Sequence, residues 1–252
     1  MSMKQAKNTK RSLTNTIKRT DLETHVYIDV SNIRSACERS CGFKIDFVRL
    51  YNYLKNKYPK LAEVRYYEGI SRGDSKKDKY FDHLRSTGYK ICTLVRKEYI
   101  DQARHKEVVC KKCGYKNIIQ VLPSKIKLKS NVDVYLTSDM LECVATNRNK
   151  RLHIVLLSCD GDYSEAICTL LRIGRRAQVT VLATPKTRRN NYLSTRLFDL
   201  SHQLDHRSYL LDSIANIKDK IKSRPPKIKH STVRTVLPHE NDTEVALPTA
   251  ER

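Results

Sequence analysis

Short apolar runs alternate along this chain with segments of helical periodicity, and this alternation limits the fold more than any other feature. Five of the runs are rich in Val, Ile and Leu, which is typical of strands buried in a sheet. We expect these strands at residues 25–30, 61–69, 89–96, 152–158 and 177–183. Strands that alternate with helices predict an α/β three-layer sandwich with a mostly parallel five-stranded sheet and right-handed crossovers.

The fourth expected strand leads directly into the stretch CDGDYSEAI, which places Asp160 and Asp162 on a strand-to-helix turn. The helix is expected to end at Gly174, because glycine often forms a left-handed C-cap. Turn and cap chemistry alone would explain both aspartates, since Asp-Gly is a common turn pair and Asp a common N-cap. The alternative is a functional site, because ligands of open parallel sheets bind at the carboxyl ends of the strands.

Further polar side chains are expected at the same edge of the sheet. Asp29 and Asn32 follow the first strand, which neighbours the fourth at the switch point of a doubly wound sheet. Asp133 lies in the first turn of a helix that precedes the fourth strand. Carboxylates that gather in this way repel one another unless a divalent cation neutralises them, and oxygen ligands favour Mg²⁺ or Mn²⁺ over zinc. The expected ligands are Asp29, Asp133, Asp160 and Asp162.

The charge of the chain indicates a polyanionic partner. It carries 49 Lys and Arg against 27 Asp and Glu, a net charge of +22, and nucleic acid is the simplest partner for such a surface. An anionic membrane is the rival, but we find no basic amphipathic anchor helix, no apolar run near the length of about 18 residues that spans a bilayer, and no signal peptide. We therefore expect a cytoplasmic protein that binds no membrane. A carboxylate-bound cation in a basic protein predicts hydrolysis of phosphodiester bonds.

Two basic stretches are candidates for contact with nucleic acid. Residues 172–196 hold seven Lys and Arg and no acid, and the phosphate contacts expected there are Arg175, Arg176, Lys186, Arg188 and Arg189. Residues 96–129 hold ten Lys and Arg against three acids, and Tyr99 and Tyr115 could stack on single-stranded bases. The plainer interpretation is that such charge runs only form solvated faces.

The cysteines suggest a second metal. The motif Cys110-Lys-Lys-Cys113-Gly-Tyr is similar to a zinc knuckle, but it supplies two ligands where a structural zinc ion takes four. The second pair expected is Cys37 and Cys41, because the loops after the first and third strands emerge at the same edge of a parallel sheet. His105 and Cys92 are other candidates, and free thiols are the alternative.

Three stretches carry a resemblance to a known family. YIDVSNIR, NVDVYLTSDM and LLSCDGDYSEAICTLLRIGRRAQVTVL resemble, in order and spacing, the motifs of the NYN (LabA-like) branch of the PIN-domain nucleases, over roughly residues 24–201. Two departures stand out: Lys129-Ser130-Asn131 replaces the usual Glu-Lys-Gly, and Tyr163 replaces the usual Phe.

The resemblance implies a PIN-like (Rossmann-like) fold and a ribonuclease that depends on Mg²⁺ or Mn²⁺. The site residues that it implies are Asp29, Asn32, Asp133, Asp160 and Asp162. Asp139 also matches the pattern, but it lies well round the helix from Asp133, so we expect it to be structural, with participation in the site as the alternative.

The expected organisation follows from the composition of each segment. It comprises a disordered basic arm at 1–23, a nuclease domain at 24–201 with an irregular basic insertion at 98–130, a C-terminal helix at 202–223 and a disordered tail at 224–252. The alternative to a metal-dependent endoribonuclease is a catalytically silent RNA-binding or regulatory scaffold. The carboxylate set favours the enzyme, because a scaffold gains nothing from carboxylates that repel one another. The RNA substrate and the oligomeric state stay open, a homo-oligomer included.

Overall fold

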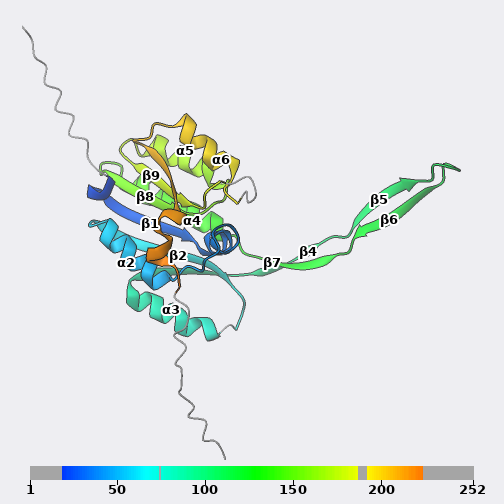
Figure 1. Cartoon of the computed structure of the whole chain (residues 1–252), viewed down its shortest axis with the longest axis horizontal. Helices are drawn as coiled ribbons and strands as arrows, with labels where there is room; N and C mark the ends of the chain where they lie inside the picture. Colours follow the sequence, from blue (N-terminus) through cyan, green and yellow to red (C-terminus); the bar gives the residue numbers. More distant parts are fainter. Residues whose placement is uncertain (1–18, 74, 187–191, 224–252) are drawn as a thin grey trace, which may run out of the picture.

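The computed structural model describes residues 19–73, 75–186 and 192–223, and within them a parallel sheet of six strands forms the centre of the molecule (Figure 1). The spatial order is β10-β9-β8-β1-β2-β3, and every pair of neighbours is parallel. The strands are β1 Glu23–Asp29, β2 Leu61–Ile70, β3 Tyr89–Val95, β8 Leu152–Leu157, β9 Gln178–Ala183 and β10 Tyr209–Ser213. The α/β sandwich is confirmed, with one strand more than the five expected.

The strand order reverses between β1 and β8. From β1 the chain adds β2 and β3 on one side, and from β8 it adds β9 and β10 on the other. In β1, Ile28 lies opposite Leu157 of β8 and Tyr66 of β2, so these strands end side by side. The expected switch point is therefore present, and the residues that follow β1 and β8 meet at one edge of the sheet.

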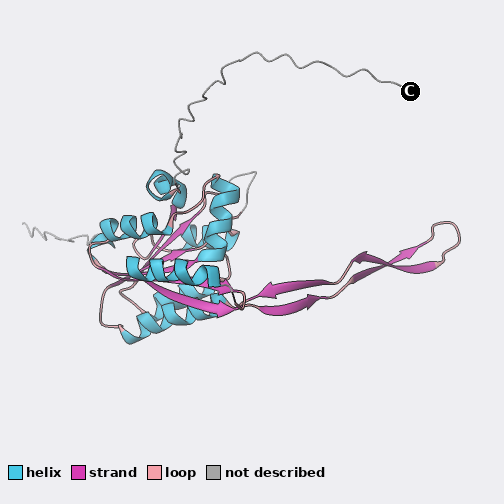
Figure 2. Ribbon diagram, turned by 90° about the horizontal axis from the view of Figure 1, so that it is seen from below, coloured by secondary structure: helices cyan, strands magenta, loops and turns pink. Residues whose placement is uncertain are grey.

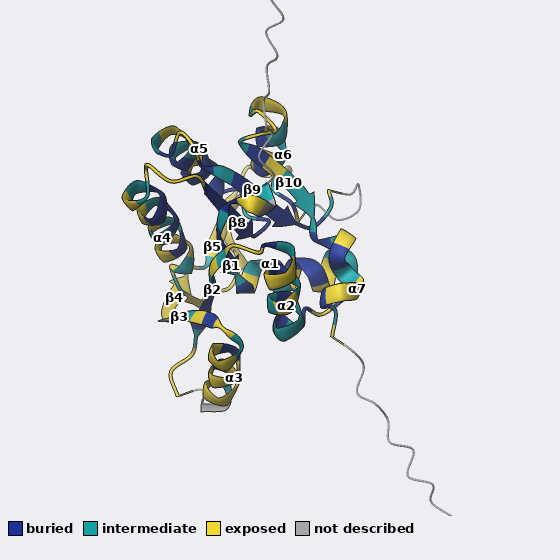
Figure 3. Ribbon diagram, turned by 90° about the vertical axis from the view of Figure 1, so that its left-hand side faces the viewer, coloured by how far each residue is buried: buried dark blue, intermediate teal, exposed yellow. Residues whose placement is uncertain are grey.

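Helices cover both faces of the sheet (Figure 3). On one face α4 packs against α5, and α5 against α6, while α2 and α3 lie together on the other face. The helices are α1 Val30–Ala36, α2 Phe47–Lys57, α3 Ser75–Thr87, α4 Val132–Thr146, α5 Tyr163–Ile173, α6 Thr195–Gln203 and α7 Lys218–Ile221. None of the described helices is long and apolar enough to cross a membrane.

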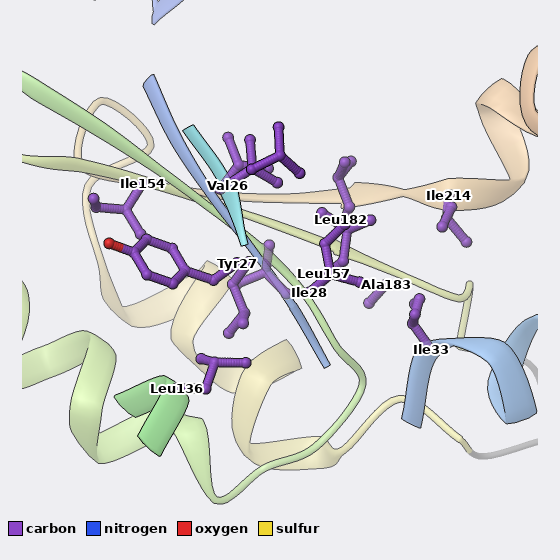
Figure 4. Close-up of a cluster of buried hydrophobic side chains, with 14 of the residues drawn as sticks. Val26, Tyr27, Ile28, Ile33, Leu136, Ile154, Leu157, Leu182, Ala183 and Ile214 are labelled. Atoms are coloured by element: carbon purple, nitrogen blue, oxygen red, sulfur yellow. The ribbon is translucent and has the colours of Figure 1, made fainter. Parts of the chain in front are cut away.

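The core lies between the sheet and these helices (Figure 4). All six residues of β8 are buried, as its continuous apolar sequence predicts for a central parallel strand. Leu136 of α4 and Ile33 of α1 belong to the same cluster, so the helices that begin near the switch point are held firmly on the sheet.

The prediction of a helix over residues 202–223 is wrong. This segment forms β10, a 3-10 turn at Ile214–Ile217 and the short α7. Its apolar residues mimic helical spacing, but the free edge of β9 offers backbone partners, and Val179 N–H donates to Ser208 O at 2.7 Å. Tyr209 is buried and its hydroxyl donates to Leu197 O at 3.0 Å, which fixes the strand beside α6.

The basic insertion is a long two-stranded ribbon and not the irregular segment expected from sequence. Between β3 and α4 the chain runs out and back as an arm that projects from the body (Figures 1 and 2). Its strands are β4 Lys97–Asp101, β5 Arg104–Val109, β6 Lys116–Leu122 and β7 Lys125–Lys129. β4 pairs with β7 near the body and β5 with β6 near the tip, both antiparallel, and every residue of these strands is exposed.

Two glycines mark close approaches between elements. A Cβ on Gly69 in β2 would lie 2.1 Å from Ser130 Oγ, so this glycine lets the base of the arm sit against the sheet. Gly174 has φ −101° and is not the left-handed cap that was expected. A Cβ there would lie 2.2 Å from Val144 Cγ1, so the glycine is needed for the approach of α4 and α5.

Candidate active site

Asp29 ends β1 and caps α1. Its Oδ1 accepts the backbone N–H of Asn32 at 3.2 Å, and its Oδ2 accepts the hydroxyl of Tyr163 at 3.1 Å. Burial raises the pKa of Asp29 to about 6, against the opposing effect of these two hydrogen bonds. The charges of Asp160 and Asp133 raise the pKa of Asp29 further, so both carboxylates lie within electrostatic reach of Asp29.

Asn32 ties the first strand to the turn after β8. Its side-chain oxygen accepts the backbone N–H of Cys159 at 2.8 Å, directly before Asp160. Asp160 Oδ1 in turn accepts the N–H of Asp162 at 3.1 Å, so the turn chemistry considered for this aspartate is present. The charge of the same carboxylate raises the pKa of Asp29, so the turn hydrogen bond does not exclude Asp160 as a site candidate.

Asp133 is exposed in the first turn of α4, and its charge acts on both Asp29 and Tyr163. Burial and the charge of Asp29 raise the pKa of Tyr163, so its hydroxyl stays protonated and donates to Asp29. The residue that departs from the family's usual Phe therefore takes part in the site. The sequence signal for this contact is the hydroxyl that Tyr163 has and the usual Phe lacks.

Asp162 stands somewhat apart from the other acids. It occupies the N-cap position of α5 but makes no side-chain cap hydrogen bond, and its Oδ1 lies 3.8 Å from Arg196 Nη1. Both side chains are exposed, so this ion pair is weak. Asp162 remains a candidate ligand on its position alone.

A shallow pocket opens beside the turn and includes residues that the sequence did not single out. Ser194 N–H donates to Cys159 O at 3.0 Å, and a Cβ on Gly161 would lie 2.1 Å from Ser194 Oγ. Glycine is therefore required where the start of α6 docks on the aspartate turn. The lining residues are Asn32, Cys159, Asp160, Gly161, Asp162, Tyr192, Ser194 and Arg196.

The donor set fits a hard divalent cation by its chemistry. Asp29, Asp133 and Asp160 offer only oxygen atoms, which Mg²⁺ and Mn²⁺ prefer, and their mutual repulsion is relieved by positive charge. Among the described residues, however, no three His, Cys, Asp or Glu side chains stand close enough to hold a metal ion as placed. The acids would have to turn toward one another to share an ion.

Asp139 serves a structural purpose on the far side of α4. Its Oδ2 lies 2.6 Å from Arg65 Nη1 and accepts the hydroxyl of Tyr67, both on β2. An acid already paired with arginine and tyrosine has little capacity left for a cation, which agrees with the structural role expected for it.

The structure divides the basic residues predicted to contact phosphates. Lys186 follows the carboxyl end of β9, on the same edge as the acids, and its Nζ lies 4.4 Å from the ring centroid of Phe198. Arg175 and Arg176 lie between α5 and the amino end of β9, at the opposite edge, in a pocket with Arg148 and Arg172. Arg188 and Arg189 lie outside the described residues. The same holds for most of the N-terminal segment 1–23 and for the tail at 224–252.

The structure does not bring the two cysteine pairs together. Cys37 and Cys41 bound a turn of π-helix after α1, where Cys37 is in the core and Cys41 packs against it. Cys110 and Cys113 lie at the tip of the projecting arm, between β5 and β6 (Figure 2). The expected pairing is therefore wrong: the third strand does emerge at the predicted edge, but the ribbon carries its cysteines away from the body.

Known proteins support the fold. The model of the NYN domain matches residues 23–199. A crystal structure of a protein of unknown function from Vibrio parahaemolyticus is similar with a TM-score of 0.52 and 17% identity, covering 82% of this chain and 99% of that chain. Phosphofructokinase-2 from Escherichia coli reaches a TM-score of 0.29 and 13% identity over 60% of this chain and 43% of its own. The comparison with curated proteins gave no significant match.

The family match spans most of the chain and contains β1, the start of α4 and the turn after β8, where the acids lie. The fold, the order of the motifs and the position of the acids agree with this match. The chain belongs to the NYN domain family of PIN-like nucleases.

Proposed function

We propose that this chain is a ribonuclease that hydrolyses RNA phosphodiester bonds with a bound Mg²⁺ or Mn²⁺ ion. The observation that carries the proposal is the convergence of Asp29 and Asp160 at the switch point, within the electrostatic reach of Asp133. A half-buried carboxylate whose pKa is raised in part by two other acids is costly to a fold that makes no use of it.

Each residue of the site has a separate task. Asp29, Asp133 and Asp160 would hold the ion, with Asp162 as a further candidate. When bound, the ion supplies positive charge and Lewis acidity for attack on the phosphate. The Tyr163 hydroxyl fixes the orientation of Asp29, and Asn32 fixes the turn that carries Asp160. Arg196 and Lys186 lie on the same edge and supply positive charge for the phosphates of the substrate.

The arm supports RNA as the partner. In its inner half the register places Lys97 opposite Lys129, Tyr99 opposite Lys127, and Asp101 opposite Lys125, all on one face of the ribbon. Lys129 Nζ lies 5.6 Å from the ring centroid of Tyr99. A row of lysines around an exposed tyrosine suits a backbone of phosphates with bases that stack.

The test is cleavage of structured and unstructured RNA by purified full-length protein with Mn²⁺, Mg²⁺ or EDTA. Asp160→Asn should lower the metal-stimulated rate by roughly 100-fold or more, because a lost ligand removes several kcal/mol of transition-state stabilisation. Asp82→Asn is the matched control, since Asp82 is an exposed carboxylate on α3 that pairs with Arg85. It should cleave like the unsubstituted protein.

One observation favours the silent RNA-binding scaffold as a second candidate: no three acids among the described residues are placed to share an ion as they stand. The same assay separates the two functions. RNA binding without cleavage in either metal would establish the scaffold, and equal cleavage by Asp160→Asn would point to a contaminating nuclease.

A further inference from the structure

The tip of the arm is a tight turn built around two cysteines. Cys110 N–H donates to Tyr115 O at 2.8 Å, and Gly114 N–H donates to Cys110 O at 2.9 Å. Gly114 has φ +70°, a left-handed conformation that closes the turn and favours glycine. Cys110 and Cys113 are the exposed cysteines of this chain, because the other six are buried or half-buried.

The turn prepares these thiols to bind a metal. Cys110 and Cys113 lie three residues apart in this turn, and both thiols are exposed. Two cysteines on one turn provide half of a tetrahedral thiolate site.

The other half of such a site is missing from the described part of the chain. A structural zinc ion takes four ligands, yet no group of three His, Cys, Asp or Glu among these residues could hold a metal. Figures 1 and 2 show the tip at the far end of the arm, clear of the body and of its remaining cysteines.

We propose that the tips of two copies of this chain bind one Zn²⁺ ion, with Cys110 and Cys113 of each copy as its four ligands. The metal thereby joins two chains into a dimer through their arms. Identical turns supply identical pairs of sulfurs, so a two-fold axis through the ion completes the tetrahedron without any other residue.

Charge around the tip suits this arrangement. Zinc bound to four thiolates carries a net charge of about −2. Lys111 and Lys112 lie between the two cysteines in the same turn, so each copy brings two cations to the ion. Without the metal these lysines would repel the second copy, and with it they neutralise the thiolate cluster.

Apolar side chains beside the tip are exposed to solvent and could be buried by a second copy. Tyr115 is 69% exposed and Ile118 is 70% exposed, and Val108, Val109 and Ile119 are exposed as well. A ribbon of two strands has no interior in which to bury them. A second ribbon that meets the first at the tip would remove part of this surface from water and add to the stability of the joint.

The test uses full-length protein, purified free of metal under reducing conditions and titrated with Zn²⁺. Light scattering after size exclusion should show the mass doubling as about one zinc ion binds for every two chains. EDTA should return the monomer. Co²⁺ in place of Zn²⁺ should give the intense sulfur-to-metal charge-transfer bands and the tetrahedral ligand-field bands of a four-thiolate site.

Two variants complete the experiment. Cys110→Ser/Cys113→Ser should neither bind zinc nor dimerise with it, whereas Cys41→Ala, which removes a thiol packed against the core, should behave like the unsubstituted chain. One zinc ion per monomer would overturn the proposal, because the chain would then supply all the ligands itself. Absence of zinc binding, or a dimer that forms without metal and survives EDTA, would overturn it equally.

Discussion

The edge of the sheet and the projecting arm both carry candidate binding residues, but the acids at the edge and the lysines and cysteines of the arm differ in how far they are buried. At the edge, Asp29 and Asp160 are partly buried at the ends of strands whose side chains lie almost entirely in the core. In the arm, every strand residue is exposed, and the backbone ladder with surface contacts such as the Lys116–Glu107 ion pair maintains the shape. Burial thus fixes the positions of Asp29 and Asp160, whereas the side chains of the arm are free to meet a partner from solution.

The largest expected difference between the two regions is in stability. Ile154→Ala in β8 removes a fully buried side chain and should lower the free energy of unfolding by about 2–5 kcal/mol. Ile126→Ala in β7 makes the same change at a side chain that is 70% exposed and should alter it by no more than about 0.5 kcal/mol. Chemical denaturation of both variants measures the contrast, and a large loss in Ile126→Ala would mean that the arm packs against something.

The dependence of stability on pH should also differ between the buried sheet and the exposed arm. His153 in β8 is buried, and its Nε2 lies 2.8 Å from Thr180 Oγ1. Burial, together with the positive charges of Arg19 and Lys57, lowers the pKa of His153 from 6.5 to about 3. The unfolded chain therefore binds more protons between these limits, and stability should fall as the pH drops from 6.5 toward 3, by up to about 1.4 kcal/mol per unit.

Unfolding measured across this pH range tests that effect. His153→Gln should flatten the acid limb of the stability curve. His105→Gln, the matched change on the exposed arm, should leave the limb as it is in the unsubstituted protein. An unchanged slope in His153→Gln would assign acid sensitivity to other groups.

The smallest expected effect concerns RNA affinity. Replacing Lys125, Lys127 and Lys129 by Gln should flatten the dependence of log affinity on log salt by about 2, because each lost phosphate contact on a single strand removes about 0.7. The same replacement of Arg148, Arg175 and Arg176, at the opposite edge of the sheet, is the control. If this second variant flattens the slope as much, RNA wraps around the body and the contrast between the two regions disappears.

The buried half of this comparison could be predicted from sequence. The apolar run before Asp160 predicts β8 closely, and the rule for doubly wound sheets predicts its place beside β1. The strand and its central place in the sheet can both be predicted because buried strands have continuous apolar sequences. The positions of these two strands predict that Asp29 and Asp160 lie close together. The contact of Tyr163 with Asp29 could not be predicted, because the partner of a hydroxyl group is known only once the fold places both residues.

The exposed half could not be predicted in the same way. The strands of the arm lack a buried face, so their alternating lysines predict a loop and not a strand. The pairing of the cysteines at the tip with Cys37 and Cys41 could not be tested without knowing that the arm projects from the body. At β10, the near-helical spacing of the apolar residues predicts a helix, whereas the strand forms because it pairs with β9 at the edge of the sheet.

The contact between Gly69 and Ser130 has a mechanical consequence. Ser130 and Asn131 are all that separates the end of β7 from α4, whose first turn carries Asp133. Ser130 lies so close to β2 that a side chain at position 69 would displace it. The displacement would pass through Asn131 to the first turn of α4, so we expect Gly69→Ala to disturb Asp133 as well as the base of the arm.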